Sequence, residues 1–108
     1  MSGSGPVGAA PTVRPPAAPW VSITCPADGL NLGEVRFGHR YRAEAGVARI
    51  VIDYGDGRSY TTDRPAFVEA AFRHNYEDFG DYKVSVRLID TLGREAVDAC
   101  SFSSNPID

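Results

Sequence analysis

Apolar and polar residues alternate along much of the chain with a period of two. The clearest example is the segment 82–88, which reads YKVSVRL, so that its apolar side chains would line one face of a strand and its polar side chains the other. This pattern predicts a strand with one buried face. Similar short segments predict further strands at 20–24, 34–43, 47–54, 59–62, 67–72 and 95–102.

The segments between these strands are rich in glycine, aspartate, asparagine and proline, which are the residues that turns favour. About seven short strands separated by such turns are typical of an all-β fold, namely an immunoglobulin-like antiparallel β-sandwich. No segment shows a convincing helical stripe of apolar residues, so we expect no helix in the fold.

The composition changes sharply near residue 20. Residues 1–19 read MSGSGPVGAAPTVRPPAAP, with a single charged side chain, and such a segment buries too little apolar surface to offset the entropy of ordering. We interpret residues 1–19 as a disordered tag remnant followed by a Pro/Ala-rich linker, and residues 20–105 as one folded domain. A linker of this kind implies a larger parent protein.

The stretch 53–57, DYGDG, carries two carboxylates and two glycines, which raises the question of an ion or phosphate site. A calcium loop of the EF-hand type requires a late Glu, but Arg64 stands at that position. A glycine-rich phosphate loop requires a third glycine, but residue 60 is Tyr. We therefore interpret 53–57 as a hairpin turn whose two glycines supply positive φ angles.

Four motifs follow one another in the second half of the chain. They read IDYGDG at 52–57, HNY at 74–76, GDYKVSVRL at 80–88 and DTLG at 90–93. In order and spacing they resemble the PKD (polycystic kidney disease) domain, whose motifs are WDFGDG, H-x-Y, G-x-Y-x-V-x-L-x-V and D-x-x-G. The resemblance covers residues 45–102 closely and the N-terminal third only by strand count. Two positions depart from the family, Ile52 in place of Trp and Tyr54 in place of Phe, and both stay apolar or aromatic.

The resemblance implies an immunoglobulin-like β-sandwich that serves as a non-catalytic module of extracellular or cell-surface proteins. The side chains of Asp53 and Asp56 would accept hydrogen bonds from turn amides, and Tyr76 or Tyr82 would bond its hydroxyl to the backbone as a corner tyrosine. Structural roles are thereby expected for Ile52, Asp53, Tyr54, Gly55, Asp56, Gly57, His74, Tyr76, Gly80, Tyr82, Asp90 and Gly93.

His74 is the residue that most invites a catalytic interpretation. A general base requires a nucleophile and an orienting carboxylate within reach, and no nucleophile motif is present, so we interpret His74 as a hydrogen-bonded structural residue. His39 lies in an arginine-rich segment, and we expect it on a solvated strand face. Two histidines without further clustered ligands do not predict a zinc site. We expect no catalytic residue, no metal and no cofactor.

Cys25 ends the first predicted strand, and Cys100 lies in the last. Elements at these places run side by side in many immunoglobulin-like sandwiches, so the two thiols could meet. A bridge closing so long a loop would stabilise the fold by about 4–5 kcal/mol in the chain-entropy account. The alternative is two independent buried thiols. A disulfide would indicate an oxidising compartment, in agreement with the location that the resemblance implies.

Alternating arginines and a few aromatic residues form a candidate ligand face. Its members are Arg36, Arg40, Arg42, Trp20 and Tyr60. Such a face would bind an acidic glycan or the carboxylates of a protein partner. In the alternative, Trp20 covers the open end of the core, and the arginines pair with nearby acids, namely Glu34, Glu44 or Glu69.

Charge and hydropathy restrict the partners. The net charge is −3 with both signs interspersed, and no apolar stretch is long enough to span a bilayer, so we expect neither nucleic acid binding nor membrane insertion. We expect a monomer whose partner is a protein or a polysaccharide. The favoured function is a spacer or protein-interaction domain of a larger bacterial protein. The alternative is an accessory polysaccharide- or substrate-binding domain of a secreted hydrolase, which a planar strip of exposed aromatic residues would favour.

Overall fold

The computed structural model describes residues 14–64 and 68–106. Residues 1–13, which make up most of the predicted tag remnant and linker, lie outside the described residues. The described part of the chain forms eight strands and one short helix. In chain order these are β1 (Trp20–Thr24), β2 (Gly33–Arg36), β3 (Gly38–Arg42), β4 (Val47–Asp53), β5 (Ser59–Thr62), α2 (Val68–Ala71), β6 (Arg73–Tyr76), β7 (Gly80–Asp90) and β8 (Glu95–Ser104).

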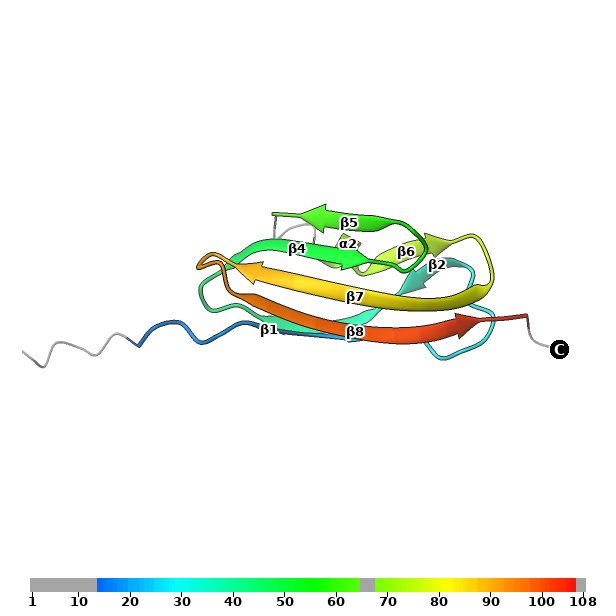
Figure 1. The fold of residues 1–108 in the computed structure, drawn as a ribbon, viewed down its shortest axis with the longest axis horizontal. Helices are drawn as coiled ribbons and strands as arrows, with labels where there is room; N and C mark the ends of the chain where they lie inside the picture. Colours follow the sequence, from blue (N-terminus) through cyan, green and yellow to red (C-terminus); the bar gives the residue numbers. More distant parts are fainter. Residues whose placement is uncertain (1–13, 65–67, 107–108) are drawn as a thin grey trace, which may run out of the picture.

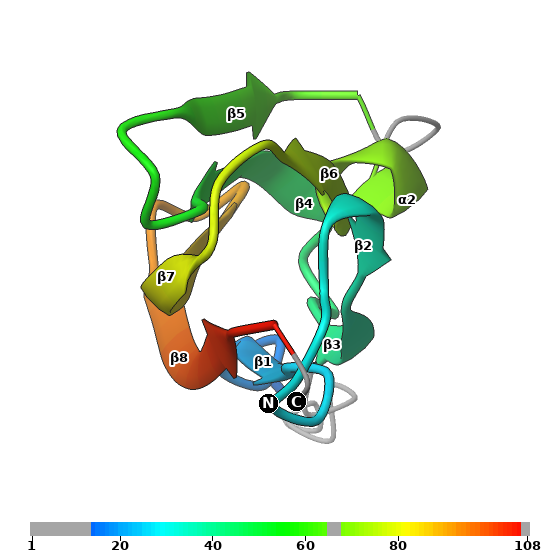
Figure 2. The ribbon, with the colours of Figure 1, turned by 90° about the vertical axis from the view of Figure 1, so that its right-hand side faces the viewer.

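The strands form two layers. One layer is a four-stranded antiparallel sheet in the order β5-β4-β7-β8. The other consists of two antiparallel pairs, β1 with β3 and β2 with β6. Figure 2 looks along the strands and shows the two layers on either side of the core. The predicted antiparallel, immunoglobulin-like β-sandwich is confirmed.

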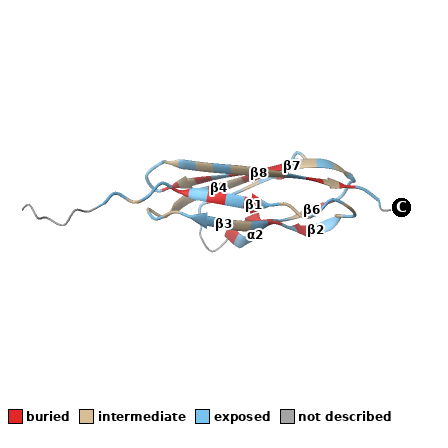
Figure 3. Cartoon of the chain, turned by 90° about the horizontal axis from the view of Figure 1, so that it is seen from below, coloured by how far each residue is buried: buried red, intermediate tan, exposed pale blue. Residues whose placement is uncertain are grey.

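Apolar and polar residues alternate along β7, and the apolar ones face the core. Val84, Val86 and Leu88 are buried, whereas the polar residues between them are exposed. On the neighbouring strand β4, Ile50 lies opposite Leu88 and Ile52 lies opposite Val86, and both isoleucines are fully buried. Buried and exposed segments alternate along the strands in the same way in Figure 3.

Aromatic rings fill the core toward the end where β7 begins. Tyr76 is only 1% exposed, and its ring centroid lies 4.6 Å from that of Tyr82, 5.3 Å from that of Phe102 and 6.4 Å from that of Phe37. Two of these contacts are edge-on, which is a favourable geometry for aromatic pairs. The rings come from both layers and therefore join them.

The single strand predicted for 34–43 is wrong, because the structure divides this segment at Phe37 into β2 and β3. Phe37 is buried, and its backbone N–H donates to the carbonyl of Phe72 rather than to a neighbouring strand. The first half pairs with β6 and the second half with β1. The division lets one segment of chain connect the two pairs of the second layer.

The strand predicted for 67–72 is also wrong. Phe67 lies outside the described residues, and the next four residues form the helix α2. Val68, Ala71 and Phe72 are all buried, a spacing of three and four that matches one turn of helix. The expectation that the fold contains no helix was therefore wrong, because a single helical turn is too short to produce a visible stripe of apolar residues.

The described chain enters and leaves the sandwich at opposite ends of its long axis. Figure 1 shows the N-terminal segment (blue) at one end and the end of β8 (red) at the other. β7 alone spans eleven residues, or about 33 Å at the usual rise per residue. The described chain therefore enters and leaves the sandwich at points roughly a strand length apart.

Candidate functional site

The hairpin turn between β4 and β5 is held by its own carboxylates. Asp53 Oδ1 accepts a hydrogen bond from the Gly55 N–H (2.8 Å), and Asp56 Oδ1 accepts one from the Arg58 N–H (3.0 Å). Gly55 and Gly57 have φ angles of 82° and 87°, a region that other residues rarely adopt. Both carboxylates are thus local backbone acceptors, as in Asx turns.

His74 lies in a small cluster around that turn. Its Nε2 donates to Asp56 Oδ2 at 2.6 Å, and its ring stacks on the ring of Tyr54 with centroids 3.9 Å apart. Tyr76 meets the same imidazole edge-on at 4.8 Å. The side chains of His74 and Asp56 are only 13% and 17% exposed, so the pair is largely shielded from water.

The ionised form of Asp56 is favoured by these contacts. Burial alone would raise the pKa of its carboxyl, but the hydrogen bonds from His74 and from the Arg58 backbone outweigh it and lower the pKa below its ordinary value. The only side-chain hydrogen bond of His74 within the described residues is the one to Asp56, and both cysteines are consumed in a disulfide. The cluster therefore attaches the β4–β5 turn to β6, and no nucleophile among the described residues hydrogen-bonds to His74.

Three tyrosine hydroxyls donate to backbone carbonyls. Tyr54 donates to Ala71 (2.6 Å), Tyr76 donates to Tyr54 (2.7 Å), and Tyr82 donates to Asp78, four residues upstream. Burial is the main cause that raises the pKa of Tyr54 to about 12, and burial likewise raises the pKa of Tyr76 and of Tyr82. Tyr82 has the short-range geometry of a corner tyrosine, whereas Tyr76 ties β6 to the end of β4.

The turn between β7 and β8 contains a buried carboxylate. Asp90 is 1% exposed, and its Oδ1 accepts hydrogen bonds from the N–H groups of Leu92 (3.0 Å) and Arg94 (2.8 Å). Its Oδ2 accepts from Arg94 Nε at 2.9 Å. Burial alone would raise the pKa of Asp90, but these bonds lower it. Gly93, with a φ of 83°, closes this turn.

Arg94 also holds the segment that enters the domain. Its two terminal nitrogens donate to the carbonyls of Pro16 (2.9 Å) and Ala17 (3.1 Å), and the Ala17 N–H donates to Glu44 Oε1 at 3.1 Å. The last residues of the predicted linker are therefore attached to the domain by three hydrogen bonds. This role of Arg94 could not be predicted from local sequence, because its partners lie 77 and 78 positions away in the chain.

Cys25 and Cys100 form a disulfide, with Cα atoms 5.6 Å apart, and the two residues are 75 positions apart in sequence. Of the two alternatives that the sequence left open, the structure has the bridge. Next to it, the Ile23 N–H donates to Asp98 Oδ2 at 2.9 Å. The bridge and this hydrogen bond together join β1, in one layer, to β8 in the other.

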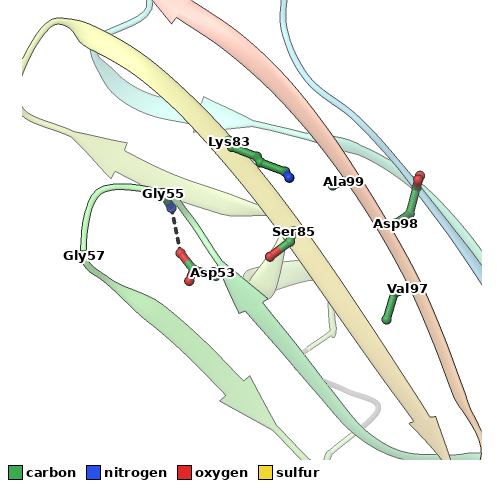
Figure 4. A pocket seen from close by; sticks show the side chains of 8 residues that line it. All are labelled: Asp53, Gly55, Gly57, Lys83, Ser85, Val97, Asp98 and Ala99. Atoms are coloured by element: carbon green, nitrogen blue, oxygen red, sulfur yellow. Dashed lines mark hydrogen bonds between the residues drawn. The ribbon is translucent and has the colours of Figure 1, made fainter.

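A surface depression of about 720 Å³ lies on the outer face of the four-stranded sheet. Figure 4 shows its side chains projecting from β4, β7 and β8, with small residues at the centre. Lys83 is its one cation, and the carboxylates of Asp53 and Asp98 already accept backbone N–H groups. The complete lining is Asp53, Gly55, Gly57, Lys83, Ser85, Val97, Asp98 and Ala99.

The candidate ligand face is only partly assembled. Tyr60 does not belong to it, because Tyr60 lies opposite Ile52 on the core side of the other sheet and packs against the core. Arg36 is exposed on β2 and pairs with Glu34, with Nε and Oε1 3.2 Å apart. Trp20 does not cover the core, as the alternative supposed, because it is 46% exposed on the outward side of β1.

Arg40 and Arg42 lie on the outward side of β3, next to β1. The register places Arg42 opposite Trp20 and Arg40 opposite Ser22. These four residues therefore share one face. His39 does not lie on a solvated face as expected, because its ring stacks on that of Phe72 with centroids 4.0 Å apart.

Within residues 14–64 and 68–106, no group of three or more His, Cys, Asp or Glu side chains is placed to hold a metal ion. No helix among the same residues is long and apolar enough to cross a membrane.

Comparison with known proteins identifies the class through structure. No protein-family model matches the sequence, and no curated protein matches it. Among solved structures, the PKD1 domain of Vibrio anguillarum Epp matches with 20% identity and a TM-score of 0.62 over 86% of this chain and 100% of that one. The PKD domain of the human VPS10 domain-containing receptor SorCS2 matches with 25% identity and a TM-score of 0.63 over 88% of this chain and 78% of that one.

A third match comes from a study of carbohydrate-binding modules of the β-sandwich superfamily, with 26% identity and a TM-score of 0.64. It covers 84% of this chain but only 36% of that one. The chain is therefore an immunoglobulin-like β-sandwich. Within that class, its fold is that of the PKD domain, as the four sequence motifs indicated.

Proposed function

We propose that this chain is a monomeric, non-catalytic module of a larger bacterial protein outside the cytoplasm, where it serves as a spacer or protein-interaction domain. Its turn carboxylates accept backbone N–H groups, and His74 bonds to one of them, Asp56, which favours a structural role. The disulfide between Cys25 and Cys100 supports a location in an oxidising compartment. The PKD1 domain of the Vibrio cholerae metalloprotease PrtV, a structural neighbour with 18% identity, shows that this fold occurs within a larger enzyme.

The observation that carries the proposal is the attachment of the incoming segment by Arg94. A spacer transmits orientation only if the chain that enters it has a fixed direction. Asp90 is buried and holds the guanidinium of Arg94 from one side, so that both terminal nitrogens are presented to the carbonyls of Pro16 and Ala17. The connections lie at opposite ends of the sandwich (Figure 1), so a neighbour on each side would be held apart along the long axis.

Backbone dynamics test this proposal directly. We expect ¹⁵N order parameters of Ala17 and Ala18 close to those of the strands in the wild-type chain, and below about 0.6 in an Arg94→Ala variant. Arg87→Ala is the matched control, because Arg87 is an exposed arginine of β7 whose only ion pair among the described residues is with Glu95. If Ala17 is as flexible in the wild-type chain as in Arg94→Ala, the fixed junction is refuted.

A second candidate function, accessory polysaccharide binding, rests on Trp20, which is exposed on the outward face of β1. Three large aromatic residues of the described chain are exposed by 36–46%, namely Trp20, Tyr41 and Phe79. They do not form one strip, because Tyr41 lies opposite Val21 on the other side of β3 and Phe79 precedes β7. The arrangement thus favours the spacer as the principal role and restricts a saccharide site to the surroundings of Trp20.

A further inference from the structure

The outward face of β1 and β3 combines an aromatic ring with two cations. Trp20 begins β1, and its side chain is 46% exposed. Arg42 lies directly opposite Trp20 across the strand pair. Arg40 lies two residues before Arg42, on the same side of β3. The two guanidinium groups therefore start from Cα atoms about 7 Å apart along the strand.

These arginines have no carboxylate partner among the described residues. The sequence offered three acids nearby, and each of them is directed elsewhere. Glu34 pairs with Arg36, Glu44 accepts the backbone N–H of Ala17, and Glu69 lies 3.9 Å from His39. Arg40 and Arg42 therefore form a local cationic surface in a chain with a net charge of −3, and the three nearby carboxylates are bound to other groups.

Next to the arginines the surface is hollowed and hydroxyl-bearing. A depression of about 500 Å³ is lined by Ser22, Thr24 and Arg40, together with Gly38 and His39. Ser22 and Thr24 lie on the outward side of β1, in line with Trp20. From Trp20 to Thr24 the row extends for about 14 Å, which is longer than a single small anion would require.

We propose that this face, defined by Trp20, Ser22, Thr24, Arg40 and Arg42, binds a carboxylate-bearing polysaccharide of the uronate type. The planar guanidinium groups match carboxylates in geometry as well as charge, and an indole ring offers an apolar surface on which a sugar ring stacks. The hydroxyls of Ser22 and Thr24 supply donors and acceptors for the sugar hydroxyls. The inference deepens the second candidate function and does not depend on the spacer role, because the Arg94 junction contains none of these residues.

Tryptophan fluorescence gives a direct test, since Trp20 is the only tryptophan of the chain. We expect oligomers of polygalacturonate to change its emission in a saturable way, more weakly as salt is added, and neutral dextran to leave it unchanged. An Arg40→Gln/Arg42→Gln variant should bind at least about tenfold more weakly, since charge-assisted hydrogen bonds are lost. The matched control is Arg49→Gln/Arg87→Gln, which removes the same charge from the exposed face of the other sheet and should keep wild-type affinity.

Affinity electrophoresis in polygalacturonate extends the test to Trp20→Ala, which has no tryptophan fluorescence to follow. Thermal unfolding of each variant verifies that it is folded. Retarded migration of the wild-type chain that is lost in Trp20→Ala supports the proposal. Equal loss in the control variant, or equal affinity for dextran sulfate, would show general attraction of polyanions and would overturn it. Absence of saturable binding to polygalacturonate would overturn it as well, while leaving the order parameters of the Arg94 junction unaffected.

Discussion

Two glycines in the hairpin turn share a backbone conformation but differ in their surroundings. Gly55 and Gly57 have φ angles of 82° and 87°. A Cβ atom added at Gly57 would meet nothing within 4 Å. At Gly55 it would lie 2.5 Å from the carbonyl oxygen of Lys83 and 3.0 Å from its backbone nitrogen, so the turn approaches β7 closely at this point.

The cost of alanine at the two positions follows from this difference. Gly57→Ala should lower the free energy of unfolding by about 1–2 kcal/mol, which is the usual cost of a left-handed conformation for a residue with a side chain. Gly55→Ala carries the same cost and adds a steric one of about 1–3 kcal/mol, because the backbone of Lys83 is paired with Ser101 of β8 and cannot move freely. The lower entropy of the unfolded chain offsets both variants equally and cancels in the comparison.

Equilibrium unfolding in urea, with the disulfide intact, measures the two variants. We expect the midpoint to fall in both, further for Gly55→Ala, with no change in the slope of free energy against urea concentration. Gly93, with a φ of 83° and open space around its added Cβ, is a second control in another turn, and Gly93→Ala should resemble Gly57→Ala. If the three variants lose the same stability, the close approach of the turn to β7 is not a determinant of this fold.

Further perturbations test the disulfide, the Asp56 carboxyl and the tyrosines. Replacing Cys25 and Cys100 by Ser should lower the free energy of unfolding by about 4 kcal/mol in urea, and an unchanged midpoint would contradict the bridge. Because the folded pKa of Asp56 lies below its ordinary value of 3.8, its contribution is fully present above that value and is lost as the pH falls through the lowered pKa. Asp56→Asn should therefore be less stable at neutral pH and decline less steeply in acid, as thermal unfolding at several pH values would show. Tyr76→Phe should cost about 1–3 kcal/mol in urea unfolding by leaving a buried carbonyl without its donor, and Tyr82→Phe about 0.5–1.5 kcal/mol, and the reverse order would contradict the assigned hydrogen bonds.

The sandwich could be predicted because local alternation determines which face of each strand is buried. The segment 82–88 shows this plainly, and its apolar residues occupy the core. The division at Phe37 could not be predicted, because the choice between β6 and β1 as a partner depends on residues far away in the sequence. The helix α2 could not be predicted for a different reason, since one turn contains too few residues to establish a period.

Some features of the candidate site could likewise be predicted from the sequence, and others could not. Motif position indicated that His74 is structural, but its bond to Asp56, 18 positions away, required coordinates. Arg94 had no signal at all, because an arginine after a turn has the same local pattern whether it points into solvent or holds a distant segment. Tyr60 was misplaced because its side of the strand depends on the register with β4.

The distribution of the charges explains why a chain of net negative charge can present a cationic face. Several carboxylates are used as acceptors for backbone N–H groups: Asp28, Asp53, Asp56, Asp90 and Asp98. Their lone pairs are thereby directed toward turns and strand edges, where backbone donors need a partner. Arginine has no acceptor and cannot serve the backbone N–H in this way, so the guanidinium groups remain at the surface unless a carbonyl or carboxylate receives them. Arg94 donates to Asp90 and to the entering segment. Arg40 and Arg42 have no side-chain partner among the described residues and lie beside the exposed ring of Trp20, and this combination makes the face of β1 and β3 the candidate ligand surface.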